Sequence, residues 1–194
     1  DRLVISRPLA GTRRRGESLE ADELLATELR EDEKERSEHT MLVDLARNDL
    51  GRVCEPSSVQ VERLMDVEYY SHVMPLSSTV IGTPRGELDA WDALRQSLPV
   101  GTVSGAPKVR AMEIIDELEP VTRGPYTGSL GYLGFNRESQ FNIAIRTAIV
   151  RNGQVHFQVG AGIVADSDPE MEFEETLAKA GGFETALSFT TETQ

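Results

Sequence analysis

The sequence predicts an α+β fold in which antiparallel strands alternate with helices. Apolar, β-branched segments between residues 129 and 164 include Asn152-Gly153, a dipeptide that indicates a tight antiparallel hairpin. Segments with helical spacing lie before and after this region. No internal repeat or low-complexity linker divides the chain, so we expect a single α+β domain.

The first half of the chain alternates between strand and helix patterns. Residues 1–7 have alternating polarity and no initiator Met, which predicts a strand already inside a fold and therefore a fragment. The Gly-bounded basic stretch 11–16 is expected to be a solvated loop in preference to a partner contact. One or two amphipathic helices are expected over 18–50, ending at 48–51, followed by strands over 59–81.

The second half begins with helical patterns and continues as sheet. Residues 88–97 have helical spacing, and Pro107 suits the first turn of a helix that reaches Glu119. Asp168 and Pro169 predict the N-cap and first position of a last helix, which ends near Leu187. Residues 188–194 lack an apolar pattern and form a tail. The three predicted strands are 129–135, 140–150 and 154–164.

The composition argues against several function classes. The 194 residues include 20 basic and 33 acidic side chains, a net charge of 20 − 33 = −13, so the chain repels phosphate and nucleic acid is not an expected partner. No apolar run approaches the roughly 20 residues that span a bilayer, so no membrane partner is expected. Cys54 is the only cysteine and no signal segment opens the chain, which favours the cytoplasm.

Two acidic segments carry candidate metal ligands. Glu35 and Glu38 are spaced i, i+3 in one predicted helix, and Glu172 and Glu175 repeat that spacing in the last one, with Lys179 a turn further. Such carboxylates could bind Mg²⁺, which keeps several waters and is completed by an anionic substrate. On spacing alone, however, solvated faces of an acidic protein explain these pairs better.

Glycine-rich stretches and one arginine are candidate anion contacts. Residues 101–108 and 160–162 match no phosphate motif and are most simply turns, although Gly105 and Pro107 place a helix N-terminus where an acidic small molecule would fit. Arg146 lies in an apolar segment. On a core-facing strand it needs an anionic partner, whereas on a solvent face it would have no significance.

Seven short sequence motifs, which occur in order along the chain, make the functional prediction more specific. They occupy residues 8–12, 38–49, 101–112, 131–132, 142–146, 160–162 and 175–179. Together they resemble the chorismate-binding domain of anthranilate synthase component I and its relatives, the aminodeoxychorismate, aminodeoxyisochorismate, isochorismate and salicylate synthases. The resemblance covers residues 1–187 as a partial catalytic domain, and it implies two packed antiparallel β-sheets with outer helices.

The resemblance also implies a metal site for the substrate's ring carboxylate. Glu38 and Glu175 match the family's direct Mg²⁺ ligands, and Glu35 and Glu172 match its supporting acidic set. This implication reverses the preference for solvated helix faces. A dianionic substrate suits a protein of this net charge only if metal and arginine concentrate positive potential locally.

Further residues correspond to the family's substrate contacts. Tyr126 and Arg146 match the pair that grips the enolpyruvyl carboxylate, and Thr102 matches a residue beside the reacting ring. The remaining substrate-binding candidates are Gly160, Ala161, Gly162, Lys179, Gly11 and Thr12. The candidate catalytic set is Thr102, His72, Glu35 and Glu172.

Two positions separate the possible activities. Aminodeoxychorismate synthases carry a nucleophilic Lys where this chain has Ala10, so direct attack of ammonia at ring carbon 2 is implied, with a glutamine amidotransferase as ammonia source. Anthranilate synthases commonly have a second His, which assists pyruvate elimination, where this chain has Pro75. We therefore expect anthranilate synthase component I activity, with aminodeoxyisochorismate synthase or aminodeoxychorismate synthase component I as alternatives.

Two further questions stay open at the level of sequence. His72 either acts in the chemistry in place of the missing second His or is a structural residue. The family's Ser-Pro-Glu segment, whose Glu protonates the departing hydroxyl, would lie upstream of residue 1. A catalytically incomplete interaction domain is therefore the non-enzyme alternative.

Overall fold

The structure is a computed structural model that describes residues 2–136, 138–165 and 167–191, without the side chains of 184–186 and 188–191. The chain divides into two compact units, Asp1–Ile115 and Asp116–Gln194. Among the described residues every strand pair is antiparallel, and helices lie before, between and after groups of strands, which confirms the α+β prediction. The elements are β1 (Val4–Ser6), β2 (Leu9–Arg14), α1 (Leu19–Glu31), α2 (Glu33–Val53), β3 (Gln60–Val67), β4 (Val73–Gly82), α3 (Ala90–Ser97), α4 (Gly101–Ser104), α5 (Lys108–Leu118), β5 (Ser129–Leu133), β6 (Ser139–Ile143), β7 (Ala148–Arg151), β8 (Gln154–Phe157) and α6 (Pro169–Thr191).

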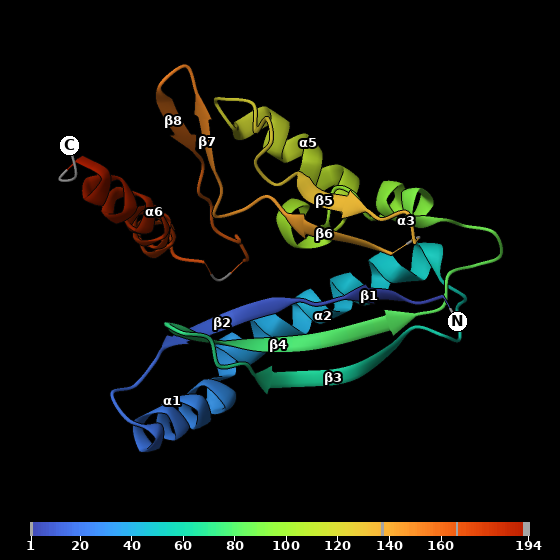
Figure 1. The fold of residues 1–194 in the computed structure, drawn as a ribbon, viewed down its shortest axis with the longest axis horizontal. Coiled ribbons are helices and arrows are strands. Elements are labelled where there is room, and N and C mark those ends of the chain that lie inside the picture. Colours follow the sequence, from blue (N-terminus) through green and yellow to red (C-terminus); the bar gives the residue numbers. More distant parts are fainter. Residues whose placement is uncertain (1, 137, 166, 192–194) are drawn as a thin grey trace. The chain divides into compact units, whose positions relative to one another are not determined.

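The first unit is built on a sheet around β4. Strands β1 and β2 pair one after the other with one edge of β4, and β3 pairs with the opposite edge (Figure 1). Residues 74–82 are all buried, and this continuous run of small, β-branched and apolar side chains is typical of a central strand. Because β1, β2 and β3 all pair with β4, the residues of β4 fix which residues of these three strands lie side by side.

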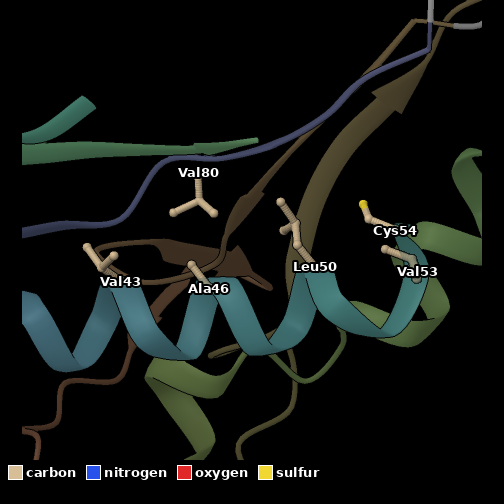
Figure 2. Packing of buried hydrophobic residues seen from close by; sticks show 6 residues of the cluster. All are labelled: Val43, Ala46, Leu50, Val53, Cys54 and Val80. Atoms are coloured by element: carbon tan, nitrogen blue, oxygen red, sulfur yellow. The ribbon is translucent and has the colours of Figure 1, made fainter. Parts of the chain in front are cut away.

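Helix α2 packs its apolar stripe against this sheet. Val43, Ala46, Leu50 and Val53 follow the three- and four-residue spacing of one helix face and are at most 6% exposed. Figure 2 shows them gathered below Val80 of β4, with Cys54 at the helix end. Asp32 caps the N-terminus of the helix, and its side chain accepts a hydrogen bond from Glu35 N. The packing and the cap together fix where the acidic first turn lies.

Two sequence predictions for this unit are wrong in their bounds. Residues 11–14 belong to strand β2 and not to a solvated loop, because Arg13 and Arg15 have carboxylate partners and Thr12, Arg13 and Arg14 pair with β4. Helix α2 continues past the expected stop at 48–51 to Val53, because Val53 is fully buried in the core.

The second unit holds two hairpins and α6. The β7–β8 turn has positive φ at Asn152 (54°) and Gly153 (74°) and pairs Arg151 with Gln154, which confirms the predicted tight hairpin. Asp168 Oδ1 accepts hydrogen bonds from the N–H groups of residues 170 and 171, as expected for the start of α6. Phe157 of β8 stacks on Phe183 of α6 with 4.4 Å between ring centroids.

The expected strands of the second unit are shorter than predicted. The predicted strand 140–150 is interrupted after Ile143, where the backbone bends and Arg146 takes a φ of +51°. The predicted strand 154–164 ends at Phe157, because the following glycine-containing segment leaves the ladder. Among the described residues, no helix is both long and apolar enough to cross a membrane.

Candidate functional site

A bulge in β2 brings a glycine next to the acidic start of α2. The register between β2 and β4 shifts between Ala10 and Thr12, and Gly11, at the shift, has a φ of +74°. A Cβ at Gly11 would lie 2.9 Å from Glu35 Oε2, so only glycine fits without displacing that carboxylate. Gly11 and Glu35, which the sequence assigned to different roles, therefore share one small region.

Arg13 organises the carboxylates of this region. Its guanidinium, 22% exposed, donates to Asp32 Oδ2 at 2.9 Å and to Glu35 Oε1 at 3.2 Å. Burial would lower the pKa of Arg13, but these hydrogen bonds outweigh burial and raise it. The pKa of Asp32 is lowered by the hydrogen bond from Glu35 N and then by Arg13. Arg13, which the sequence predicts to lie in a solvated loop, thus holds Glu35 in place.

The neighbouring Glu38 and His39 point to different environments. Glu38 is 47% exposed, with Lys34 Nζ 3.9 Å away, whereas His39 is fully buried. His39 Nε2 lies 2.7 Å from Ser78 Oγ and Nδ1 lies 3.4 Å from Ala10 O. Burial lowers the pKa of His39, which favours a neutral ring that donates to Ala10 O and accepts from Ser78.

His39 is a residue that sequence reasoning passed over. It ties α2 to the residue that precedes Gly11, so it supports the bulge of β2. The sequence did indicate that His39 is buried, because it lies four residues before Val43 and so continues the apolar face of α2.

Pro75 lies near the start of β4, and His72 directly precedes that strand. Pro75 is buried and pairs with Thr12 directly after the bulge, which is one of the places where a strand tolerates proline. Pro75, one of the two positions that separate the possible activities, is therefore adjacent to a predicted substrate-binding residue. His72 is exposed in the turn between β3 and β4, so it is not a buried core residue. Its carbonyl accepts from Arg15 N at 3.2 Å.

Thr102 lies in the short helix α4 with a buried, unsatisfied hydroxyl. Its Oγ1 has no hydrogen-bond partner in the part of the chain that the structure describes, and a buried polar atom without a partner is costly. Asp49 Oδ2 accepts from Gly101 N at 3.1 Å, while Lys108 Nζ donates to Asp49 Oδ1 at 3.0 Å and to Pro99 O at 2.7 Å. This buried pair holds the segment that carries Thr102.

The second unit brings together a phenol and an arginine. Burial raises the pKa of Tyr126, and the positive charges of Arg123 and Arg146 partly offset that effect, so the phenol is a neutral donor near neutral pH. Arg146 is exposed in the bend after β6. Of the two positions that the sequence allows, a core-facing strand is therefore excluded. Its positive charge nevertheless lowers the pKa of Tyr126 slightly, less than that of Arg123 does.

The glycine segment and α6 complete this group. Lys179 Nζ donates to Gly160 O at 3.0 Å and lies 2.5 Å from Glu175 Oε1. A Cβ at Gly160 would lie 2.9 Å from the Tyr126 hydroxyl, so glycine permits the close approach of the phenol. Tyr126, Gly160, Lys179 and Glu175 are therefore connected by direct contacts within one unit.

Three other members of the predicted site, Ala161, Gly162 and Glu172, belong to the same unit. Ala161 is half-buried and Gly162 is exposed, both in the segment that follows β8. Glu172 Oε1 accepts from Ser167 Oγ at 2.8 Å, which orients it one turn before Glu175. Sequence reasoning did not single out Arg123. Its spacing from Glu119 (i, i+4) and from Tyr126 (i, i+3) could have indicated that the three side chains are neighbours.

The two predicted Mg²⁺ ligands belong to different units. Glu38 lies in the first and Glu175 in the second, so their convergence on one ion stays a prediction. Within the described residues, no group of three or more His, Cys, Asp and Glu side chains is placed to hold a metal. The oxygen donors themselves, two carboxylates from each of two helices, suit Mg²⁺ chemically.

The chain is similar to several known enzymes that use chorismate. The chain is 61% identical to anthranilate synthase component 1 of Streptomyces coelicolor over 96% of its own length and 36% of that protein. It is 52% identical to aminodeoxychorismate synthase component 1 of Bacillus subtilis over 98% of its length and 41% of that protein. The chain thus spans little more than a third of these relatives.

Solved structures show the same architecture. Anthranilate synthase component I from Streptococcus pneumoniae matches with a TM-score of 0.80 and 50% identity over 92% of this chain and 39% of that chain. The menaquinone-specific isochorismate synthase from Escherichia coli matches with a TM-score of 0.82 and 30% identity over 95% of this chain and 42% of that chain. The family model described as chorismate binding enzyme matches residues 1–185, and the chain therefore belongs to the chorismate-binding enzyme family.

Proposed function

We propose that the full-length protein containing this chain is a Mg²⁺-dependent enzyme that converts chorismate and ammonia to anthranilate. Ammonia adds at ring carbon 2, and the carbon-4 hydroxyl departs as water. Loss of the carbon-2 proton and of the enolpyruvyl group as pyruvate then leaves the aromatic product. The observation that carries the proposal is the close approach of Tyr126 to Gly160 and the hydrogen bond from Lys179 to Gly160, to which Arg146, exposed in the bend after β6, adds a cation of the same unit.

This group has the chemistry that a dicarboxylate requires. Arg146 offers a planar fork of donors, Tyr126 a neutral hydroxyl, and Lys179 an ammonium group beside the glycine backbone. In a chain of net charge −13, such a local concentration of donors supports an anion-binding role. Glu38 and Glu175 would hold the Mg²⁺ ion, with Glu35 and Glu172 supporting them, and the ion would neutralise the ring carboxylate.

The route of amination follows from Ala10, which has no amine to attack the ring. Free ammonia is therefore the nucleophile, and a glutamine amidotransferase subunit or domain is the proposed source. The relatives named anthranilate synthase component 1 support this choice, while the Bacillus subtilis relative keeps aminodeoxychorismate as a product to be tested.

Pro75 favours aminodeoxyisochorismate as a second candidate product. Pro75 is buried opposite Thr12 and has neither an ionisable side chain nor an N–H group, so it cannot move a proton during pyruvate elimination. Unless His72 takes over that step, the enzyme would release aminodeoxyisochorismate.

Product analysis of the full-length protein tests these alternatives. Chorismate, Mg²⁺ and ammonium salt are supplied at alkaline pH, where ammonia is abundant, and the products are separated by chromatography. Anthranilate with equimolar pyruvate supports the proposal, and an EDTA-treated sample serves as the metal control. Release of aminodeoxyisochorismate without pyruvate would contradict the formation of anthranilate and support the second candidate, an aminodeoxyisochorismate synthase. Unchanged chorismate would refute both and favour a non-catalytic interaction domain.

A further inference from the structure

An arginine with a carboxylate partner lies beside Tyr126. Arg123 donates from Nε to Glu119 Oε2 at 2.9 Å and from Nη2 to Glu119 Oε1 at 2.6 Å, a two-point ion pair just after α5. Both side chains are partly buried. Glu119 therefore fixes the plane of the guanidinium and neutralises its charge.

The same guanidinium contacts the Tyr126 region in two ways. Its central carbon lies 5.8 Å from the centroid of the Tyr126 ring, within the range of a cation–π interaction. Its Nη1 donates to Thr127 Oγ1 at 3.2 Å, and Thr127 Oγ1 donates in turn to Tyr126 O at 2.6 Å.

The backbone next to Tyr126 needs this support. Thr127 has a φ of +63°, which is unfavourable for a β-branched residue and persists only where the surroundings hold it. Thr127 N donates to Ala144 O at 3.0 Å, and the hydroxyl is held by Arg123. Without these contacts, the turn that aims the phenol could relax.

We propose that Arg123, held by Glu119, is a positioning residue that keeps the Tyr126 hydroxyl directed at the Gly160 segment. This inference rests on the proposed function, because it assigns to Tyr126 a contact with a substrate carboxylate. Glu119 pairs with Nε and Nη2 along one edge of the guanidinium, and Nη1 donates to Thr127. Each nitrogen of Arg123 thus already has a partner within the protein, and Arg123 does not itself bind the substrate carboxylate. It acts on the substrate only through the phenol.

The proposal predicts a defined kinetic pattern. A hydroxyl that binds a spectator carboxylate stabilises the bound substrate and the transition state alike, so loss of its position raises KM and leaves kcat nearly unchanged. For Arg123→Met we expect a KM for chorismate about five- to tenfold higher, with kcat within about twofold of the wild type. Arg123→Lys keeps a cation over the ring and should recover part of the loss.

Glu119→Gln separates positioning from direct binding. If Arg123 bound substrate directly, removal of its competing carboxylate would leave KM unchanged or lower it. If Arg123 positions Tyr126, loss of the two-point pair loosens the guanidinium and raises KM. A rise of about two- to fivefold is expected, and an unchanged or lower KM would overturn the proposal.

The test uses the full-length enzyme with a double-mutant cycle. Arg123→Met is measured alone and together with Tyr126→Phe. The combined variant should be no worse than Tyr126→Phe alone, because both changes remove one interaction. The matched control is Arg110→Met, which breaks an exposed arginine–glutamate pair spaced i, i+3 and should leave KM unchanged. Additive losses in the cycle would overturn the proposal.

A structural readout keeps the proposal independent of turnover. Full-length protein labelled with [¹³C]tyrosine is examined by NMR, and the Tyr126 signal is identified as the one missing from Tyr126→Phe. This signal should shift in Arg123→Met, or in Arg123→Lys if the Met variant does not fold, but not in Arg110→Met. An unmoved signal would overturn the positioning role. If the wild type does not consume chorismate, the proposed function fails, and this signal still decides the position of Tyr126.

Discussion

Replacement of Lys108 by methionine tests how the segment around Thr102 is held. Lys108 Nζ makes two hydrogen bonds, at 3.0 Å to Asp49 Oδ1 and at 2.7 Å to Pro99 O. Methionine has a similar length but no donor. The variant therefore leaves Asp49, whose side chain is 7% exposed, with the hydrogen bond from Gly101 N as its remaining contact in this cluster.

The size of the effect follows from burial. Removing one partner of a buried ion pair costs about 3–5 kcal/mol because the other charge stays uncompensated. Lys108 is 14% exposed and Asp49 keeps the bond from Gly101, so the lower end, about 3 kcal/mol, applies. At about 1.4 kcal/mol per factor of ten, the opening equilibrium of the segment should rise by about two orders of magnitude.

Hydrogen exchange of the full-length protein, followed by mass spectrometry of the peptide over residues 99–105, measures this opening directly. The Lys108→Met peptide should exchange about 100-fold faster, and kcat should fall because Thr102 is no longer held. Arg47→Met, which breaks an exposed pair with Asp44 on α2, is the control and should change neither. Exchange within threefold of the wild type in Lys108→Met would refute the view that this pair holds the segment.

Three further predictions concern the proposed chemistry of the full-length enzyme. Glu175→Gln should keep the far-UV circular dichroism spectrum but abolish Mg²⁺-dependent turnover, and normal activity would rule out its role as a ligand. Arg146→Lys keeps the charge but loses the planar fork, so kcat/KM for chorismate should fall at least about tenfold, or about 1.4 kcal/mol; wild-type kinetics would mean that Arg146 does not bind substrate. If the wild type releases aminodeoxyisochorismate, Pro75→His should shift the chromatographic profile towards anthranilate, and an unchanged profile would place the missing proton transfer elsewhere.

Local signals in the sequence were sufficient for most elements. The Asn152-Gly153 turn, the Asp168-Pro169 helix start and the apolar stripe of α2 each depend on neighbouring residues alone, and the structure confirms them. The family could also be predicted from the sequence, because seven short motifs occur in the expected order. The match of the family model over residues 1–185 confirms this prediction. Strand lengths were less predictable, since apolar runs do not reveal where the ladder ends.

Contacts between distant residues required the tertiary structure. Arg13, Arg14 and Arg15 form a basic run in the sequence, yet only the approach of α1 and α2 to β2 gives Arg13 and Arg15 their carboxylate partners. His39 has an ordinary position in a helix, and its support of the bulge at Gly11 depends on a strand 29 positions away.

The sequence by itself determined which chemical groups this protein possesses and the local elements that carry them, because caps, turns and helix faces arise from residues a few positions apart. Only the tertiary structure decided which groups meet. Gly160 and Lys179 are brought to Tyr126 by the path of the chain between β8 and α6, and no periodicity records that approach. The physical reason is that burial and hydrogen bonding act through space, so the neighbours of a side chain depend on packing and not on its place in the sequence.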